Sequence, residues 1–206
     1  APGADDNASG TVGVLEAARI LAPYEFQSTL YFVAWSGEEE GLVGSSEWVA
    51  WAVDEGLDIR AYVNLDMEGY LSGPRDLDVL SNGSSQWLRN LAFEAGPLYV
   101  PSLPLVDGSL PFGASSDHAP FWEAGYPAIF FFEDSDQYSP YIHTTQDVVG
   151  LSLNSFDFMK ENIQVAVAVV ATLAEPFTIA ITHDPLPDTE NTLQPYAVTA
   201  TIVGAA

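Results

Sequence analysis

Three apolar runs rich in β-branched and aromatic residues alternate with helix-like segments, and this alternation most restricts the fold. The runs cover residues 28–35, 61–66 and 127–132, and a less regular run covers 77–80. Runs without polar alternation are typical of strands buried on both faces. Helical spacing or capping signals mark the segments at about 12–22, 45–55, 84–95 and 155–174. Strands alternating with helices predict an α/β fold with a mostly parallel sheet between helices.

The remaining segments are predicted from their proline and glycine content. Residues 101–116 are expected to form a loop, and a short helix is expected to start near Asp117. We expect residues 1–175 to form one domain and the proline-rich residues 176–195 to form a linker. Residues 196–206 alternate like a strand, which is either the start of a C-terminal β domain or an edge strand of the main domain.

Acidic residues outnumber basic ones by 29 to 5, which gives the 206-residue chain a formal charge of −24. Such a charge repels phosphate groups and argues against nucleic acid or an anionic membrane surface as partner. It suits cation binding or solubility in salt, which screens the self-repulsion, so we expect a secreted protein in a saline or extracellular setting. The chain has no cysteine, which excludes disulfides and thiolate metal sites. No apolar run is long enough to span a membrane.

Acidic side chains recur where the predicted strands end and helices begin. Asp6 precedes the first helix, Glu38 and Glu39 follow the first strand, and Asp66 ends the second, while His143 lies in a later loop. Sites in such sheets lie at the carboxyl ends of the strands. Carboxylate and imidazole groups together suit Zn²⁺. Each group also has an ordinary interpretation, as a helix cap, a solvated turn or a structural histidine.

Six stretches of the sequence, in order over about residues 1–175, resemble the co-catalytic dizinc aminopeptidases of the bacterial leucyl aminopeptidase type. They are Ala1–Gly10, Ser36–Ser45, Val63–Met67, Ser116–His118, Gly125–Ala128 and Ile142–Asp147. The resemblance implies an α/β fold with a mixed sheet between helices. It also implies removal of N-terminal residues from a peptide substrate, or cleavage of related amides.

The resemblance assigns the metal ligands position by position. Asp6 resembles the carboxylate that bridges two zinc ions, with a cis peptide bond to Asn7. Glu39 and His143 complete one zinc site with Asp6, and Asp66 binds the other ion. The family's first ligand is a histidine in a His-x-Asp motif, which this chain does not contain. Two zinc ions are therefore expected in the complete enzyme, with one site incomplete here.

The resemblance also assigns catalytic and substrate-binding roles. Glu38 resembles the general base that takes a proton from the attacking water. Met67 and Ile142 flank ligands where the family places the walls of the side-chain pocket, which implies preference for an apolar N-terminal residue. Asp117 and His118 are expected either to orient a ligand loop or, for His118, to be structural.

Two further expectations follow from the missing motif. We expect the chain to be a piece of a longer polypeptide, with another chain or an N-terminal segment covering an open edge of the sheet. Besides an aminopeptidase, a catalytically silent structural or adhesive module of a larger surface protein is expected as an alternative. A carboxypeptidase or aminoacylase of the same superfamily ranks lower, because the five basic residues leave few candidates to bind a substrate carboxylate.

Overall fold

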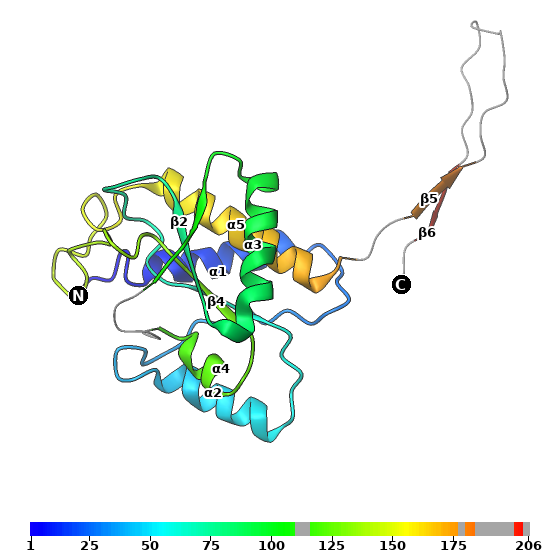
Figure 1. Cartoon of the computed structure of the whole chain (residues 1–206), viewed down its shortest axis with the longest axis horizontal. Coiled ribbons are helices and arrows are strands. Elements are labelled where there is room, and N and C mark those ends of the chain that lie inside the picture. The colour runs from blue at the N-terminus through cyan, green and yellow to red at the C-terminus, as the bar shows by residue number, and fades with distance from the viewer. Residues whose placement is uncertain (110–115, 177–179, 184–199, 204–206) are drawn as a thin grey trace, which may run out of the picture.

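The computed structural model describes residues 1–109, 116–176, 180–183 and 200–203. Its main body is a four-stranded sheet between two layers of helices, as the sequence predicts (Figure 1). The helices are α1 (Ala8–Leu21), α2 (Val43–Asp54), α3 (Gln86–Tyr99), α4 (Ala119–Glu123) and α5 (Phe156–Ala174), with a 3₁₀ turn at Gly83–Ser85. The strands of this sheet are β1 (Tyr62–Leu65), β2 (Leu77–Ser81), β3 (Leu105–Asp107) and β4 (Ala128–Phe132).

The sheet is mixed, with strand order β1-β4-β2-β3. β1 pairs in parallel with β4, and β2 pairs in parallel with β3, while β2 and β4 are antiparallel. The carboxyl ends of β1 and β4 therefore meet at one edge of the sheet. Asp66 follows β1 directly at that edge, as the predicted strand placed it.

The two faces of β4 bury different clusters, which explains why this strand is apolar throughout. Ile129 and Phe131 belong to the core formed with α3 and α5. Phe130 and Phe132 face the opposite side, where they pack with Met67. Helices α1, α3 and α5 cover the first face, and α2 and α4 cover the second (Figure 1).

Two helix starts agree with capping residues in the sequence, whereas α2, expected from about residue 45, begins at Val43 after Leu42, which makes no side-chain cap. Asn7 caps α1, where its side-chain oxygen accepts a hydrogen bond from the Gly10 N–H at 2.9 Å. Ser155 caps α5 by accepting from the Phe158 N–H at 3.3 Å. Such caps satisfy donors that have no partner inside the helix. Local sequence therefore fixes where both helices begin.

The strand predicted over residues 28–35 is wrong. The segment has no regular secondary structure and pairs with no strand in the described part of the chain, and its Tyr31 and Phe32 are 64% and 39% exposed. Just before it, Phe26 makes an isolated antiparallel bridge to Pro176. A strand forms by hydrogen-bonding to a neighbouring strand. Among the described residues, β1 lies at the end of the sheet and pairs only with β4, so residues 28–35 have not joined the sheet there. An apolar, β-rich composition was not sufficient to form the strand.

Two further predictions about local structure are corrected. The helix expected over residues 84–95 runs from Gln86 to Tyr99 and continues through Pro97, although proline cannot donate a backbone hydrogen bond. The segment 101–116, expected to be a loop, contains β3, whose three residues pair with β2 between Pro104 and Gly108. A strand of three residues between turn-forming residues cannot be recognised from the sequence pattern.

Near the C-terminal end, β5 (Ala180–His183) and β6 (Ala200–Val203) pair antiparallel in a separate two-stranded sheet. β5 falls inside the range 176–195 that was expected to be a linker, and β6 falls inside the expected strand at 196–206. The division into domains stays a prediction. In the described residues, no helix has the length and apolar character needed to cross a membrane.

Candidate metal centre

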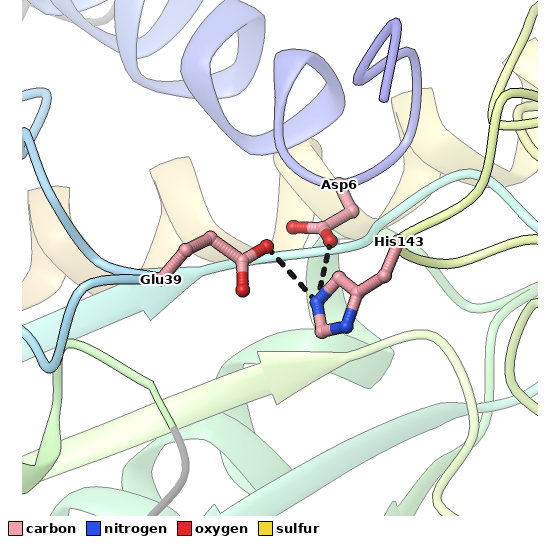
Figure 2. A group of neighbouring side chains, drawn as sticks. All are labelled: Asp6, Glu39 and His143. Atoms are coloured by element: carbon pink, nitrogen blue, oxygen red, sulfur yellow. Dashed lines mark ion pairs between the residues drawn. The ribbon is translucent and has the colours of Figure 1, made fainter.

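Asp6, Glu39 and His143 converge on one point, although they lie far apart in the sequence (Figure 2). His143 Nε2 lies 3.3 Å from Asp6 Oδ2 and 2.9 Å from Glu39 Oε1. One potential ligand atom from each residue lies within 4.8 Å of the others. Two carboxylates and an imidazole are a typical zinc ligand set. The structure thus brings together three of the four residues expected to bind metal in the spacing that one ion requires.

The Asp6 loop is held against the end of β1 by close backbone packing. A Cβ atom on Gly10 would lie 2.2 Å from the Leu65 carbonyl oxygen, so only glycine permits this approach. Asn7 Nδ2 donates to the same carbonyl at 3.0 Å. The peptide bond between Asp6 and Asn7 is cis, as the resemblance implied. The start of α1 therefore lies directly over the residue that precedes Asp66.

Asp147 joins the Asp6 loop to the loop that carries His143. Its buried carboxylate accepts hydrogen bonds from the backbone N–H of Asp5 at 2.9 Å and of Asp6 at 3.2 Å. The backbone carbonyl of Asp147 also accepts from the Ala4 N–H at 3.2 Å. Because His143 lies four residues earlier in the same loop, these bonds set the distance between Asp6 and His143.

The Glu38–Glu39 turn folds back onto the start of α2. The Gly44 N–H donates to the Ser36 carbonyl at 2.9 Å, and a Cβ atom at Gly44 would lie 2.6 Å from that oxygen. Within the turn, the Leu42 N–H donates to the Glu38 carbonyl at 2.8 Å. These contacts fix the turn while leaving the Glu39 side chain 56% exposed, at the open side of the site.

Two of the four described non-glycine residues with positive φ angles lie at the site. They are His143 and Met67, with φ angles of 59° and 57°, while Leu42 and Glu175 are the other two. Left-handed backbone costs a non-glycine residue of order 1 kcal/mol, and such residues cluster at functional sites. His143 is also 60% exposed, so burial of its ring does not account for this conformation.

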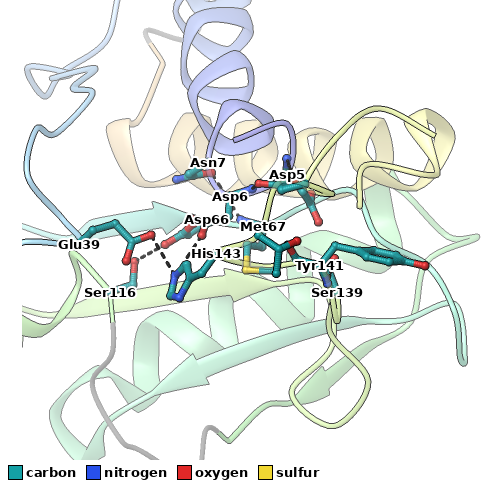
Figure 3. A network of polar contacts seen from close by, with 12 residues as sticks. Asp5, Asp6, Asn7, Glu39, Asp66, Met67, Ser116, Ser139, Tyr141 and His143 are labelled. Carbon is teal, nitrogen blue, oxygen red and sulfur yellow. Dashed lines mark hydrogen bonds and ion pairs between the residues drawn. The ribbon is translucent and has the colours of Figure 1, made fainter. Parts of the chain in front are cut away.

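Asp66 lies beside this cluster and is held by a neighbouring hydroxyl (Figure 3). The Ser116 hydroxyl donates to Asp66 Oδ2 at 2.7 Å. Asp66 Oδ1 is shielded from solvent, and none of the groups in the described ranges hydrogen-bonds to it. A buried carboxylate oxygen without a partner is costly. A cation at this position would supply the missing partner.

Burial, reinforced by neighbouring carboxylates, raises the pKa values of the acidic groups at the site. Burial, and then Glu39, raise the pKa of Asp6 to about 6. Burial, and then Glu39 and Asp117, raise the pKa of Glu38 to about 7. Burial also raises the pKa of Asp66 well above its usual range, and the nearby Asp6 adds to this effect. Burial is the largest cause of each shift and neighbouring carboxylates add to it, and a bound cation would favour the charged form of all three groups.

The structure also places the remaining residues that the sequence indicated: the two expected pocket residues, His118 and Asp117. Met67 is buried in an apolar cluster against which Ile142 packs, so the two expected pocket residues are neighbours. His118 is buried in the core, stacked on Phe130 at 4.8 Å, and burial lowers its pKa to about 4. A neutral imidazole packed in this way is structural. Asp117 instead accepts a hydrogen bond from the Ser45 hydroxyl, which fixes the start of α2.

Three residues that contact the site carry no role predicted from the sequence: Asn64, Ser116 and Asp147. Asn64 and Ser116 hydrogen-bond to each other at 2.8 Å, and Ser116 continues to Asp66. Asp147 holds the Asp6 backbone. All three lie within the stretches that carry the resemblance, which was the one available signal. Their partners are 50 to 142 residues away, beyond the reach of local pattern.

Comparison with known proteins agrees with this geometry. The model of peptidase family M28 matches residues 1–167, and the chain belongs to that family. A probable leucine aminopeptidase of Arthroderma otae is 36% identical over 183 residues, which cover 84% of this chain and 48% of that protein. The resemblance to zinc aminopeptidases expected from the motifs is thereby confirmed.

Solved structures show the same fold. The LapA aminopeptidase of Legionella pneumophila superposes with a TM-score of 0.75 at 30% identity, over 84% of this chain and 47% of that one. BSAP, a zinc aminopeptidase from Bacillus subtilis, gives a TM-score of 0.70 at 31% identity, over 85% and 43%. The chain thus spans about half the length of the proteins it matches.

Proposed function

We propose that this chain carries most of the active site of a zinc-dependent aminopeptidase, which hydrolyses N-terminal apolar residues from peptides. The convergence of Asp6, Glu39 and His143 within ligand distance carries the proposal. These are residues that the motifs assign to metal binding, in a chain of peptidase family M28. Helix capping and surface turns alone would not bring two carboxylates and an imidazole together from three separate loops.

The residues present fit zinc. Asp6, Glu39 and His143 would hold one ion, and Asp66 with Asp6 would bind the second, where Asp66 has an oxygen that no described group satisfies. When bound, zinc supplies a Lewis acid for the scissile carbonyl and makes a coordinated water more acidic. Ser116 holds the other oxygen of Asp66 and so orients this carboxylate.

Glu38 moves the proton. Its carboxylate precedes a ligand in the same turn and has a pKa raised to about 7 by burial and by Glu39. A group with a pKa near the working pH can accept a proton from the attacking water and then return it to the leaving amine. Met67 and Ile142 supply an apolar wall for the N-terminal side chain.

The test measures release of p-nitroaniline from Leu-p-nitroanilide by the protein, with and without a chelator. We expect activity that is lost on chelation and restored by Zn²⁺. Glu38→Gln is expected to lower kcat at least 100-fold while zinc content is unchanged, because general-base catalysis contributes about 10²–10⁴. Glu40→Gln, in the same exposed turn, is the matched control and should retain activity. Equal activity of both variants would refute the role of Glu38.

One observation favours the alternative of a catalytically silent structural module. The resemblance assigns only Asp6 and Asp66 to the second zinc, and the His-x-Asp motif that supplies a histidine ligand in the family does not occur in this sequence. Metal analysis discriminates the two functions. Two zinc ions per molecule support the peptidase, whereas one ion or none, together with no release of p-nitroaniline, supports the silent module.

We also propose that the free edge of the sheet is covered in the working protein, by another chain or by a segment outside residues 1–206. β1 pairs with β4 alone, and Tyr31 and Trp51 expose 64% and 47% of their surface. Unpaired edges beside apolar side chains are normally protected. Slow hydrogen exchange at residues 30–35 in the intact protein would support this, and rapid exchange would refute it. The acidic surface favours a secreted location.

A further inference from the structure

A continuous chain of hydrogen bonds runs from the aromatic cluster between α2 and α4 to Asp66. Trp35 Nε1 donates to the Tyr62 hydroxyl at 2.9 Å, and that hydroxyl donates to Asn64 Oδ1 at 2.7 Å. Asn64 Nδ2 donates to Ser116 Oγ at 2.8 Å, and Ser116 donates to Asp66 Oδ2 at 2.7 Å. We call these residues the Trp35–Asp66 relay.

The order of donors and acceptors along the relay starts at Trp35, the end farthest from Asp66. An indole N–H can only donate, so the Tyr62 oxygen accepts from Trp35, and its own hydrogen remains available for Asn64 Oδ1, to which it donates. The Asn64 side chain must then present oxygen to Tyr62 and nitrogen to Ser116. With one acceptor position of Ser116 Oγ occupied by that amide, its hydrogen is free to donate to Asp66.

This order of donors and acceptors makes the two carboxylate oxygens of Asp66 different. Oδ2 receives the Ser116 hydrogen, whereas Oδ1 has no partner among the groups that the structure describes. If the Asn64 amide were reversed, Ser116 would have to donate to the amide oxygen. Its lone pairs would then face Asp66 Oδ2, which would repel the carboxylate from its present position. The relay therefore decides which oxygen is left for a cation.

We propose that Tyr62 is a positioning residue for the metal centre: with Trp35, it sets the direction of the relay and so leaves Asp66 Oδ1 free as the ligand atom. This inference rests on the proposed function, because it assigns Asp66 to a metal. Tyr62 itself does not touch the ligand site. Its ring is held by stacking on Phe121, with centroids 3.9 Å apart and planes 4° apart. The hydroxyl thus has little freedom to leave the relay.

The proposal is tested by measuring Co²⁺ binding to the full chain, with Tyr62→Phe and a matched control variant. Calorimetry gives the affinity, and the d–d absorption of the bound ion reports its coordination. We expect Tyr62→Phe to weaken Co²⁺ binding about tenfold and to change the absorption band, since residues that orient metal ligands have effects of this size. Tyr126→Phe is the control. It removes another half-buried hydroxyl of the same cluster, bonded to the Leu57 carbonyl at 3.1 Å and outside the relay. It should change affinity less than twofold.

A double-mutant cycle separates positioning from a general loss of packing. Ser116→Ala removes the group through which Tyr62 acts, so adding Tyr62→Phe to it should cost no further affinity. Additive losses would overturn the relay, as would equal affinities for Tyr62→Phe and wild type. If wild type binds no Co²⁺ at all, the proposed function fails together with the relay. Binding by wild type that is unaffected by Tyr62→Phe overturns the relay alone.

Discussion

Replacing Asp147 with asparagine is expected to disturb the metal centre without changing a ligand. Both carboxylate oxygens of Asp147 are in use: Oδ1 accepts from the Asp5 N–H and Oδ2 from the Asp6 N–H. An asparagine can offer an oxygen to only one of these donors, and its NH₂ group would face the other. One buried N–H next to the bridging Asp6 would then lose its partner.

The expected loss of stability in Asp147→Asn follows from these two hydrogen bonds. A hydrogen bond to a charged acceptor contributes about 1.5–3 kcal/mol, and the bond that remains in the variant is to a neutral oxygen. Asp147 is fully buried, so water cannot replace the lost partner. We therefore expect Asp147→Asn to lower the free energy of unfolding by about 2–3 kcal/mol. The looser Asp6 loop should weaken Zn²⁺ binding about tenfold.

Asp134→Asn provides the control, because Asp134 also accepts two backbone hydrogen bonds. These come from Asp136 at 2.8 Å and Gln137 at 2.7 Å, both within its own exposed turn. Guanidinium denaturation gives the stability of each variant, and competition with a chromophoric chelator gives the Zn²⁺ affinity. If both variants bind Zn²⁺ as tightly as wild type, Asp147 does not position Asp6, and this account of the site is wrong.

Two further predictions concern stability. His118 has a pKa lowered to about 4 by burial, against 6.5 when unfolded, so the stability present above pH 6.5 should fall by about 3 kcal/mol as the pH drops toward 4. His118→Leu should remove that part of the pH dependence, and an unchanged slope in denaturation curves would contradict the assignment. Gly10→Ala should cost more than about 2 kcal/mol and weaken Zn²⁺ binding, because its Cβ would meet the Leu65 carbonyl. Gly83→Ala, where a Cβ meets nothing within 4 Å, should be close to neutral in both measurements.

Elements with local signals were predictable from the amino-acid sequence. β4 was evident from its uninterrupted apolar run, since both of its faces are buried, and α5 was evident from its Ser155 cap and helical spacing. The position of Asp66 after β1 was also predictable, because the end of a strand is marked by its first polar residue. The ligand roles came from the motifs of a family, not from spacing.

The contacts between these residues depend on the folded chain. Residues 28–35 have the composition of a strand but pair with no strand in the described ranges, and β3 forms between turn residues because β2 lies beside it. Asp6 and His143 meet because Asp147 binds the Asp6 backbone across 141 residues of sequence. Periodicity and capping depend on neighbours within a few residues, whereas pairing, ligand convergence and the direction of a hydrogen-bond relay depend on groups that only the folded chain brings together.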